Sequence, residues 1–368
     1  MTRSGLYSQR VSNLQARMEQ AGVDLVAISP TANMRYLLDF APLADERPCA
    51  LLVTRAETRL VVPQLNADEV ETHTHMSTVR WTDAEGPRRA FVQALEELNL
   101  RPGGVLAADN AMRADALLLL QDLAVPGKSL PVGDLMATLR MQKSEVELEV
   151  LARAAAMADN ALMAGAQACR PGATEREVAE KIAASFRSEG ADVVDFTTVG
   201  SGPNGAFPHH QFGDRRLEAG DMIVIDIGAT LAGYHSDVAR VVHLGEPTAE
   251  ERTVFEVVRE AKRRGREAAV AGARARDVDR ATRQVIERAG YGPMFAHRTG
   301  HGLGLEVHEP PWITSESDTV LEPGMVFSVE PGIYLQGQFG VRLEDIVVIT
   351  DKECRCLTGL DEAIILKP

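Results

Sequence analysis

The sequence predicts a two-domain protein, an α/β domain followed by an α+β domain that contains an internal repeat. Three observations lead to this prediction. The chain has 368 residues, which is more than one hydrophobic core usually organises. Helix and strand patterns alternate along the first part of the chain. In the second part, two segments resemble each other at a fixed offset.

The first domain is predicted from apolar periodicity. Residues 9–21 and 90–98 have the spacing of amphipathic helices, whereas residues 24–29, 49–54 and 58–63 are short apolar runs typical of strands. Helices and strands that alternate in this way favour an α/β architecture.

The boundary between the domains is predicted near residue 135. A turn cluster occupies residues 131–133, and a little further on Ser144 and Glu147 form the capping-box pattern that begins a long Ala-rich helix. We therefore assign residues 1–134 to the first domain and residues 135–368 to the second.

The second domain contains the repeat. Residues 217–228 align without a gap on residues 321–332, an offset of 104, and residues 172–178 resemble residues 272–278 at an offset of 100. A repeat of this kind indicates two similar structural units. We expect two halves, each a helix pair followed by strands.

The repeat places a carboxylate at the same position in each half. Asp226 and Glu330 each end an apolar strand, and a second acid follows each of them, Asp237 and Glu344, beyond Gly-rich segments that predict hairpins. If the halves pack face to face, the four carboxylates converge. Buried carboxylates repel one another unless cations neutralise them, so the pattern predicts a site for two divalent metal ions.

A histidine-rich segment supplies a nitrogen ligand for such a site. His297, His301 and His308 lie within twelve residues, and the glycines between them allow close backbone approach. One imidazole among carboxylates suits Mn²⁺, Co²⁺, Fe²⁺ or Zn²⁺ better than Ca²⁺. Each residue alone has an ordinary explanation, as a solvated side chain or a turn residue, and the combination carries the prediction.

The segment Gly200-Ser-Gly-Pro-Asn-Gly205 matches a dinucleotide-binding pattern but is not interpreted as one. Pro203 follows the second glycine and no helix is expected to open at Gly205, so the strand–turn–helix context is missing. We interpret the segment as the loop that presents His209.

Composition excludes several other classes of protein. With 53 acidic and 39 basic residues the net charge is −14, which argues against nucleic acid as a partner. Four scattered cysteines do not suggest a disulfide framework and are expected to be reduced. No signal peptide or membrane span is predicted, so a cytoplasmic location is expected.

Taken together, the motifs resemble the pita-bread metallopeptidase family M24, in its proline-specific branch of prolidases and aminopeptidases P. The resemblance implies a creatinase/prolidase-type α/β N-terminal domain and an α+β pita-bread catalytic domain with a pseudo-twofold repeat. The motifs are Asp226-x10-Asp237, His297-x3-His301-Gly-x-Gly-x3-His308-Glu, Ser328-Val-Glu330-Pro-Gly and Arg342-Leu-Glu344-Asp, with Tyr36-Leu-Leu-Asp-Phe40 and Glu46-Arg-Pro48 in the first domain.

This resemblance implies five metal ligands, Asp226, Asp237, His301, Glu330 and Glu344. They would hold two divalent ions per subunit, with Mn²⁺ favoured and Co²⁺ or Zn²⁺ as alternatives. A hydroxide that bridges the two ions would attack the peptide carbonyl, and the ions would stabilise the charge of the tetrahedral intermediate.

The same resemblance implies catalytic roles for further side chains. His209 matches the position that helps to donate a proton to the leaving proline nitrogen, with His210 as the weaker candidate. His308 matches the position that hydrogen-bonds the scissile carbonyl. Glu330 is expected to take a proton from the attacking water as well as to bind metal.

Substrate-binding roles are implied for His297, Arg342 and Tyr234. His297 matches a position that lines the proline pocket. For Arg342 two roles remain open: it anchors a substrate carboxylate, or it orients Glu344 and the neighbouring Tyr234.

The expected activity is that of an exopeptidase that cleaves between an N-terminal residue and proline in small peptides. An Xaa-Pro dipeptidase is favoured, and an Xaa-Pro aminopeptidase that acts on longer peptides is the alternative. A non-catalytic binding module on the same fold and a metal-free amidinohydrolase are more remote alternatives. The resemblance also suggests a homodimer that forms through the N-terminal domain.

Overall fold

The computed structural model describes residues 3–367, which divide between Arg140 and Met141 into two compact units. The division falls later than the predicted boundary at residues 134 and 135. The reason is helix α6 (Gly133–Arg140), which packs against α1 (Arg3–Ala21) of the first unit. The Arg140 guanidinium also donates to the side-chain oxygen of Asn33 at 2.7 Å, so α6 belongs to the first unit.

The first unit is an α/β structure, as the alternating patterns predict. Its six-stranded mixed sheet has the order β4-β3-β2-β1-β5-β6, and helices α4 and α5 pack on one face. Sequence periodicity located three of the strands and helix α4 to within two residues, whereas α1 begins six residues before its predicted start. The elements other than α1 and α6 are β1 (Leu25–Ile28), α2 (Ala32–Leu38), β2 (Ala50–Val53), β3 (Thr58–Pro63), α3 (Gln64–Thr74), β4 (Thr78–Trp81), α4 (Arg88–Glu97), β5 (Val105–Ala108), α5 (Ala114–Ala124) and β6 (Lys128–Pro131).

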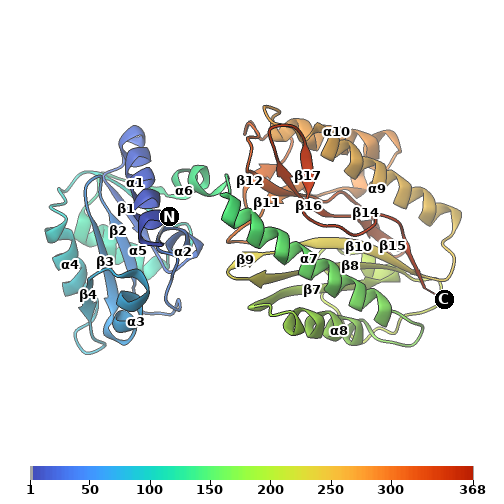
Figure 1. Ribbon diagram of the computed structural model, residues 1–368, viewed down its shortest axis with the longest axis horizontal. Helices are drawn as coiled ribbons and strands as arrows, with labels where there is room; N and C mark the ends of the chain where they lie inside the picture. The colour runs from blue at the N-terminus through green and yellow to red at the C-terminus, as the bar shows by residue number, and fades with distance from the viewer. Residues whose placement is uncertain (1–2, 368) are drawn as a thin grey trace. The chain divides into compact units, whose positions relative to one another are not determined.

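The second unit has two halves, and each begins with a helix pair (Figure 1). The first half contains α7 (Glu145–Ala168), α8 (Glu175–Ser188), β7 (Val193–Ser201), the 3₁₀ turn η1 (Gly202–Ala206), β8 (Met222–Leu231), β9 (Tyr234–His235) and β10 (Val238–Leu244). The second half contains α9 (Ala249–Ala268), α10 (Ala275–Arg288), η2 (Gly292–Met294), β11 (Gly300–Gly302), β12 (Glu309–Ile313), β13 (Val326–Val329), β14 (Gly332–Leu335), β15 (Phe339–Arg342), β16 (Asp345–Ile349), β17 (Cys354–Cys356) and β18 (Ile365–Lys367).

The strands of the second unit form two five-stranded sheets and one hairpin. One sheet has the order β18-β10-β8-β7, with β9 paired to β8, and the other has the order β12-β11-β13-β16-β17. The hairpin β14–β15 is the predicted one that follows Glu330. Helix α7 begins at the predicted capping box, in which Ser144 and Glu147 cap each other.

The aligned segments of the repeat contain the first part of β8 and the whole of β13, and their alternating side chains explain where the two acids point. Asp226, which was expected at the end of its strand, lies within β8. Ile225 and Ile227 of β8 are buried in the core under α7 and α8. Phe327 and Val329 of β13 are buried in a second core that includes residues of α9 and α10. Because side chains alternate along a strand, Asp226 lies on the face of its sheet that points away from the helices, and Glu330 continues the same alternation beyond β13.

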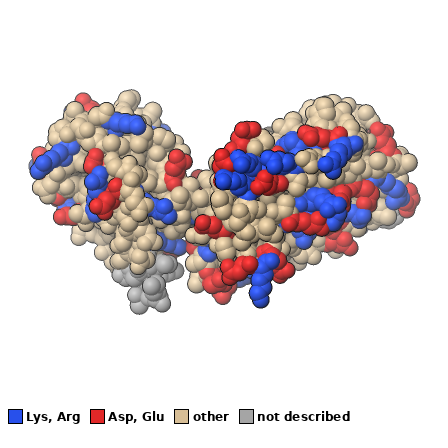
Figure 2. Space-filling view, turned by 90° about the horizontal axis from the view of Figure 1, so that it is seen from above, with Lys and Arg blue, Asp and Glu red and all other residues tan. Residues whose placement is uncertain are grey.

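Charged side chains of both signs are interspersed on the face shown in Figure 2. The acidic excess of the sequence is therefore not gathered there. All four cysteines are free and at least partly buried. None of the helices in the described part of the chain has the length and apolar content that a membrane crossing needs.

Candidate metal centre

A backbone contact joins the two sheets beside the predicted ligands. The amide of Glu344 donates to the carbonyl of Ala239 at 3.1 Å, and the two residues form an isolated antiparallel bridge. Glu344 directly precedes β16, and Asp237 directly precedes β10. The bridge therefore brings Asp237 of one half next to Glu344 of the other.

Three of the predicted ligands form a compact buried group. Ligand atoms of Asp237, His301 and Glu344 all lie within 4.8 Å of one another. Nε2 of His301 lies 3.7 Å from Asp237 Oδ2 and 3.3 Å from Glu330 Oε1. Glu330 thus borders the group on the His301 side. Asp226 is close enough to raise the pKa values of the other three acids, so all five predicted ligands lie in one region.

The clustered carboxylates of this region would be stabilised by a bound cation. Burial, followed by the neighbouring carboxylates, raises the pKa values of Asp237 and Glu344 well above their ordinary range. Burial also raises the pKa of Glu330 to about 8, against the opposing charge of Arg342. Without a cation, these carboxyls hold their protons more strongly than free carboxyls do.

Unsatisfied oxygen atoms support the same conclusion. Oδ1 of Asp226, Oδ1 of Asp237 and Oε1 of Glu344 are buried and meet no hydrogen-bond partner in the described part of the chain. Buried polar atoms without partners are rare. The pKa of His301 is lowered to about 3 by burial, with His308 adding to the effect, so its ring is neutral and able to bind metal. A donor set of carboxylate oxygens and one imidazole nitrogen fits divalent transition metals.

Two glycines let the His301 strand approach its neighbours. A Cβ at Gly300 would lie 1.8 Å from the carbonyl oxygen of Ser328, and one at Gly302 would lie 2.2 Å from that of Pro310. The amide of His301 also donates to the Ser328 hydroxyl at 3.0 Å. The close approach predicted for these glycines is what positions His301.

The two predicted catalytic histidines are exposed beside the buried group. The rings of His301 and His308 meet edge to face, with centroids 4.2 Å apart. Burial lowers the pKa of His308, and the charges of Arg298 and His209 lower it further. His209 and His308 therefore lie near each other at the open side of the site.

The loop that carries His209 is anchored by one buried carboxylate. Glu175, at the start of α8, accepts hydrogen bonds from the Ser201 amide, the Ser201 hydroxyl, Asn204, His210 and the Gly213 amide, at 2.7–3.1 Å. Residues 202–206 form the 3₁₀ turn η1 and no α-helix follows, in agreement with the interpretation of the Gly-rich segment as a loop. Because His210 binds Glu175, it is His209 that remains exposed.

Arg342 differs from the sequence expectation. Its guanidinium pairs with Asp226 and donates to the hydroxyl of Tyr334 at 2.8 Å. That hydroxyl lies 2.9 Å from Nε2 of His297. Tyr234, which was expected beside Arg342, instead donates its hydroxyl to Glu147 at 2.8 Å. Of the two roles left open, these contacts favour orientation of a predicted metal ligand, which is Asp226 rather than Glu344.

Sequence reasoning missed Tyr334, which belongs to the hairpin between Glu330 and Arg342. Strand β14 pairs with β15, so a tyrosine on one strand lies next to an arginine on the other. The predicted hairpin was the signal that could have identified it.

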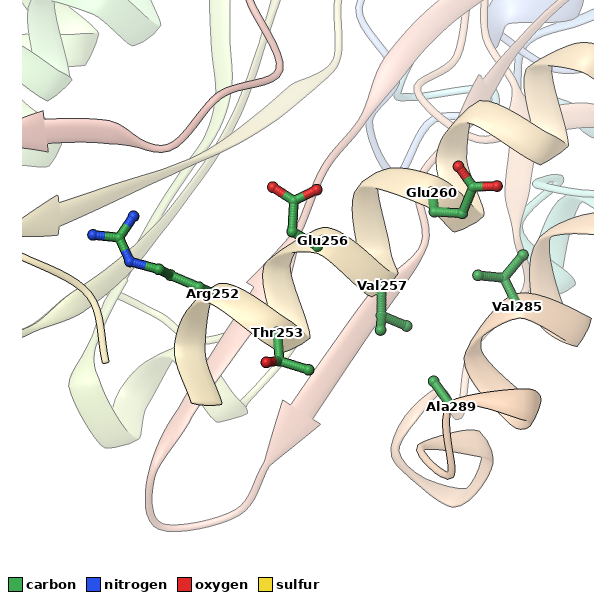
Figure 3. Close-up of a pocket in the computed structure, with 7 residues that line it drawn as sticks. All are labelled: Arg252, Thr253, Glu256, Val257, Glu260, Val285 and Ala289. Atoms are coloured by element: carbon green, nitrogen blue, oxygen red, sulfur yellow. The ribbon is translucent and has the colours of Figure 1, made fainter. Parts of the chain in front are cut away.

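The groove between α9 and α10 is a separate feature (Figure 3). It has a volume of about 460 Å³ and contains none of the predicted site residues. Residues of α9 and of the end of α10 line it: Arg252, Thr253, Glu256, Val257, Glu260, Val285 and Ala289. The groove contains no histidine, and its two glutamates, Glu256 and Glu260, are paired with arginines, so it is not the candidate site.

Comparison with known families decides what kind of protein carries this centre. Residues 149–351 match the model of metallopeptidase family M24, and residues 10–142 match the creatinase/prolidase N-terminal domain. The chain belongs to metallopeptidase family M24. An M24 metallopeptidase uses divalent metal, and the Asp237, His301 and Glu344 group is a possible ligand set for it.

Relatives of this M24 metallopeptidase cover nearly the whole chain. A probable dipeptidase PepE of Mycobacterium tuberculosis is 36% identical over 99% of this chain and 97% of its own. The Xaa-Pro dipeptidase of Pyrococcus furiosus is 32% identical over 97% of this chain and 99% of its own. Among solved structures, the recombinant prolidase of Thermococcus sibiricus superimposes with a TM-score of 0.93 at 36% identity, covering 98% of this chain and 99% of that one.

Proposed function

We propose that this M24 metallopeptidase is an Xaa-Pro dipeptidase, which hydrolyses the bond between an N-terminal residue and proline. The observation that carries the proposal is the buried convergence of Asp237, His301 and Glu344 with unsatisfied carboxylate oxygens. The relatives named Xaa-Pro dipeptidase and prolidase support the choice of substrate. The substrates would be small peptides with proline in the second position, and the protein would act as a homodimer.

Five side chains are proposed to hold two divalent ions, with Mn²⁺ favoured and Co²⁺ or Zn²⁺ as alternatives. When bound, such ions polarise a peptide carbonyl and make a bound water acidic near neutral pH. The proposed ligands are Asp226, Asp237, His301, Glu330 and Glu344.

The remaining steps belong to the protein's own side chains. Glu330, whose Oε1 lies 3.3 Å from Nε2 of His301, would accept the proton of the attacking water. His308, exposed next to His301, would donate a hydrogen bond to the scissile carbonyl oxygen. His209 would provide a proton to the proline nitrogen as it leaves.

A chain of hydrogen bonds links Arg342, Tyr334 and His297 beside these catalytic side chains. Tyr334 accepts a hydrogen bond from Arg342 and lies within bonding distance of His297, whose Nδ1 is 2.7 Å from the Arg298 carbonyl. A neutral His297 can donate from Nδ1 and accept at Nε2, and burial lowers its pKa to about 4. We propose that this chain holds Asp226 in place through Arg342 and gives His297 a fixed orientation beside the proline pocket.

Hydrolysis assays with defined metal content test the proposal. Metal-stripped enzyme would be supplied with Mn²⁺ and given the dipeptide Ala-Pro or the tripeptide Ala-Pro-Ala, with Glu344→Ala as the control. Metal-dependent cleavage of Ala-Pro alone supports a dipeptidase, and preference for the tripeptide supports an aminopeptidase instead. Absence of cleavage of both peptides by the Mn²⁺-loaded protein would refute the peptidase proposal and favour a binding module.

A further inference from the structure

Arg298 is a cation at the metal centre that the roles described so far do not use. Within the described residues, its guanidinium forms no hydrogen bond and no ion pair. Other arginines close by are paired, Arg342 with Asp226 and Arg283 with Asp279. A half-buried arginine without an anionic partner is unusual, because burial of a charge needs a compensating contact.

The strand register places this guanidinium on the same side as the metal ligand His301. Strands β11 and β12 are antiparallel, and His301 lies directly opposite Trp312. Directly opposed residues in an antiparallel pair project from the same face of the sheet. The guanidinium carbon of Arg298 lies 4.6 Å from the centroid of the Trp312 ring. Trp312 thus acts as a support that holds Arg298 on the His301 face.

The backbone on the other side brings Arg298 close to Glu330. The amide of Glu330 donates to the carbonyl of Thr299 at 2.8 Å, and Thr299 directly follows Arg298. Electrostatic effects agree with this position. After burial, the charge of Arg298 is the next cause of the low pKa of His308, and it also opposes the raised pKa of Glu330.

A cation in this place suits an anionic group of the substrate. In an Xaa-Pro dipeptide, the terminal carboxylate is only three bonds from the scissile carbonyl carbon, so it must bind within a few ångströms of the reacting atoms. In a longer peptide, a neutral amide occupies the same position. The planar guanidinium matches carboxylate geometry with two parallel hydrogen bonds.

We propose that Arg298, supported by Trp312, binds the terminal carboxylate of the dipeptide and so sets the preference for dipeptides over longer peptides. This inference rests on the proposed Xaa-Pro peptidase function and adds a specificity-determining residue to it. It also accounts for the missing partner of Arg298, since the substrate itself provides the anion.

The test compares Ala-Pro with Ala-Pro amide, which differ in the terminal carboxylate alone, on Mn²⁺-loaded enzyme. For the wild type, we expect kcat/KM to be higher for the acid. Arg298→Gln should lower kcat/KM for the acid by about 30-fold, mainly through KM, and leave the amide within about threefold. Arg298→Lys, which keeps the charge but loses the planar fork, should fall between the two.

Two further variants separate binding from structure. Trp312→Leu removes the support and keeps the charge, and it should also weaken the acid selectively. Arg280→Gln, an exposed arginine on α10 whose contact is a surface ion pair with Asp277, is the matched control and should change neither substrate. Equal losses for acid and amide in Arg298→Gln, or no loss for either, would overturn the inference. Wild-type enzyme that cleaves neither substrate would instead reject the underlying peptidase function, and the inference with it.

Discussion

Replacement of Arg240 by methionine provides a demanding test of how the metal centre is held together. Arg240 lies three residues after Asp237 and is 1% exposed. Its guanidinium donates to the carbonyl oxygens of Ala239, Glu344, Leu360 and Asp361, and it forms an ion pair with Asp345 at 2.7 Å. These contacts join the strand after Asp237 to the backbone of Glu344.

The expected loss of stability follows from these contacts. Methionine fills much of the volume but removes all five hydrogen bonds, each with a net value of about 1 kcal/mol. The buried ion pair is lost as well, although Lys262 remains 2.6 Å from Asp345. Loss of one partner of a buried ion pair costs roughly 3–5 kcal/mol. The bond to Asp345 is counted in both figures, so they are not added, and we expect Arg240→Met to lower the free energy of unfolding of the metal-free protein by at least about 3–5 kcal/mol.

Urea unfolding of the metal-free protein, followed by circular dichroism, measures this loss. The exposed Arg88→Met is the matched control, because its partner Asp122 is also exposed, and it should change stability by less than about 0.5 kcal/mol. Arg240→Met should also bind Mn²⁺ more weakly, since the link between Asp237 and Glu344 is loosened. A loss of less than about 1 kcal/mol, with unchanged Mn²⁺ affinity, would show that Arg240 does not hold the two halves of the site in place.

Three more predictions concern protons, the His209 loop and backbone packing. Because burial raises the pKa of Glu330 to about 8 from about 4.5 when unfolded, the folded metal-free protein binds more protons than the unfolded chain in that window. The stability of the metal-free protein should therefore fall as pH rises from about 5 to 8. Mn²⁺ binding at pH 7 should release protons, which calorimetry in buffers of different ionisation enthalpy would detect. Mn²⁺ binding without proton release would contradict this prediction. Glu175→Gln should lower kcat/KM about tenfold at unchanged metal content, because an amide cannot accept all five hydrogen bonds that hold the loop of His209; unaltered kinetics would argue against a positioning role. Gly300→Ala should destabilise the protein by more than about 3 kcal/mol in thermal or urea unfolding, because the added Cβ would overlap the Ser328 carbonyl. A variant as stable as the wild type would show that strands β11 and β13 can move apart to accept the Cβ.

Local patterns predicted much of this structure. The capping box of Ser144 and Glu147 begins α7, because a cap depends on residues within one helical turn. The strand Thr58–Pro63 has the bounds expected from its apolar run. Asp226 and Glu330 were predicted to converge because the repeat places a carboxylate at the same position in each half.

Packing decided what local patterns left open. Helix α6 has the same local sequence whichever unit it joins, and its contact with α1 assigned it to the first. Strand pairing placed Tyr334, rather than the expected Tyr234, beside Arg342.

The sequence by itself predicted the two-domain organisation, the repeated halves and a set of candidate metal ligands, because these predictions depend on periodicity, spacing and side-chain chemistry. The tertiary structure decided which of those residues touch: the bridge between Ala239 and Glu344, the orientation of Asp226 by Arg342 and the support of Arg298 by Trp312. Such contacts join segments that are distant in the chain, and their geometry depends on how the two sheets pack, which the spacing of residues along the sequence does not specify.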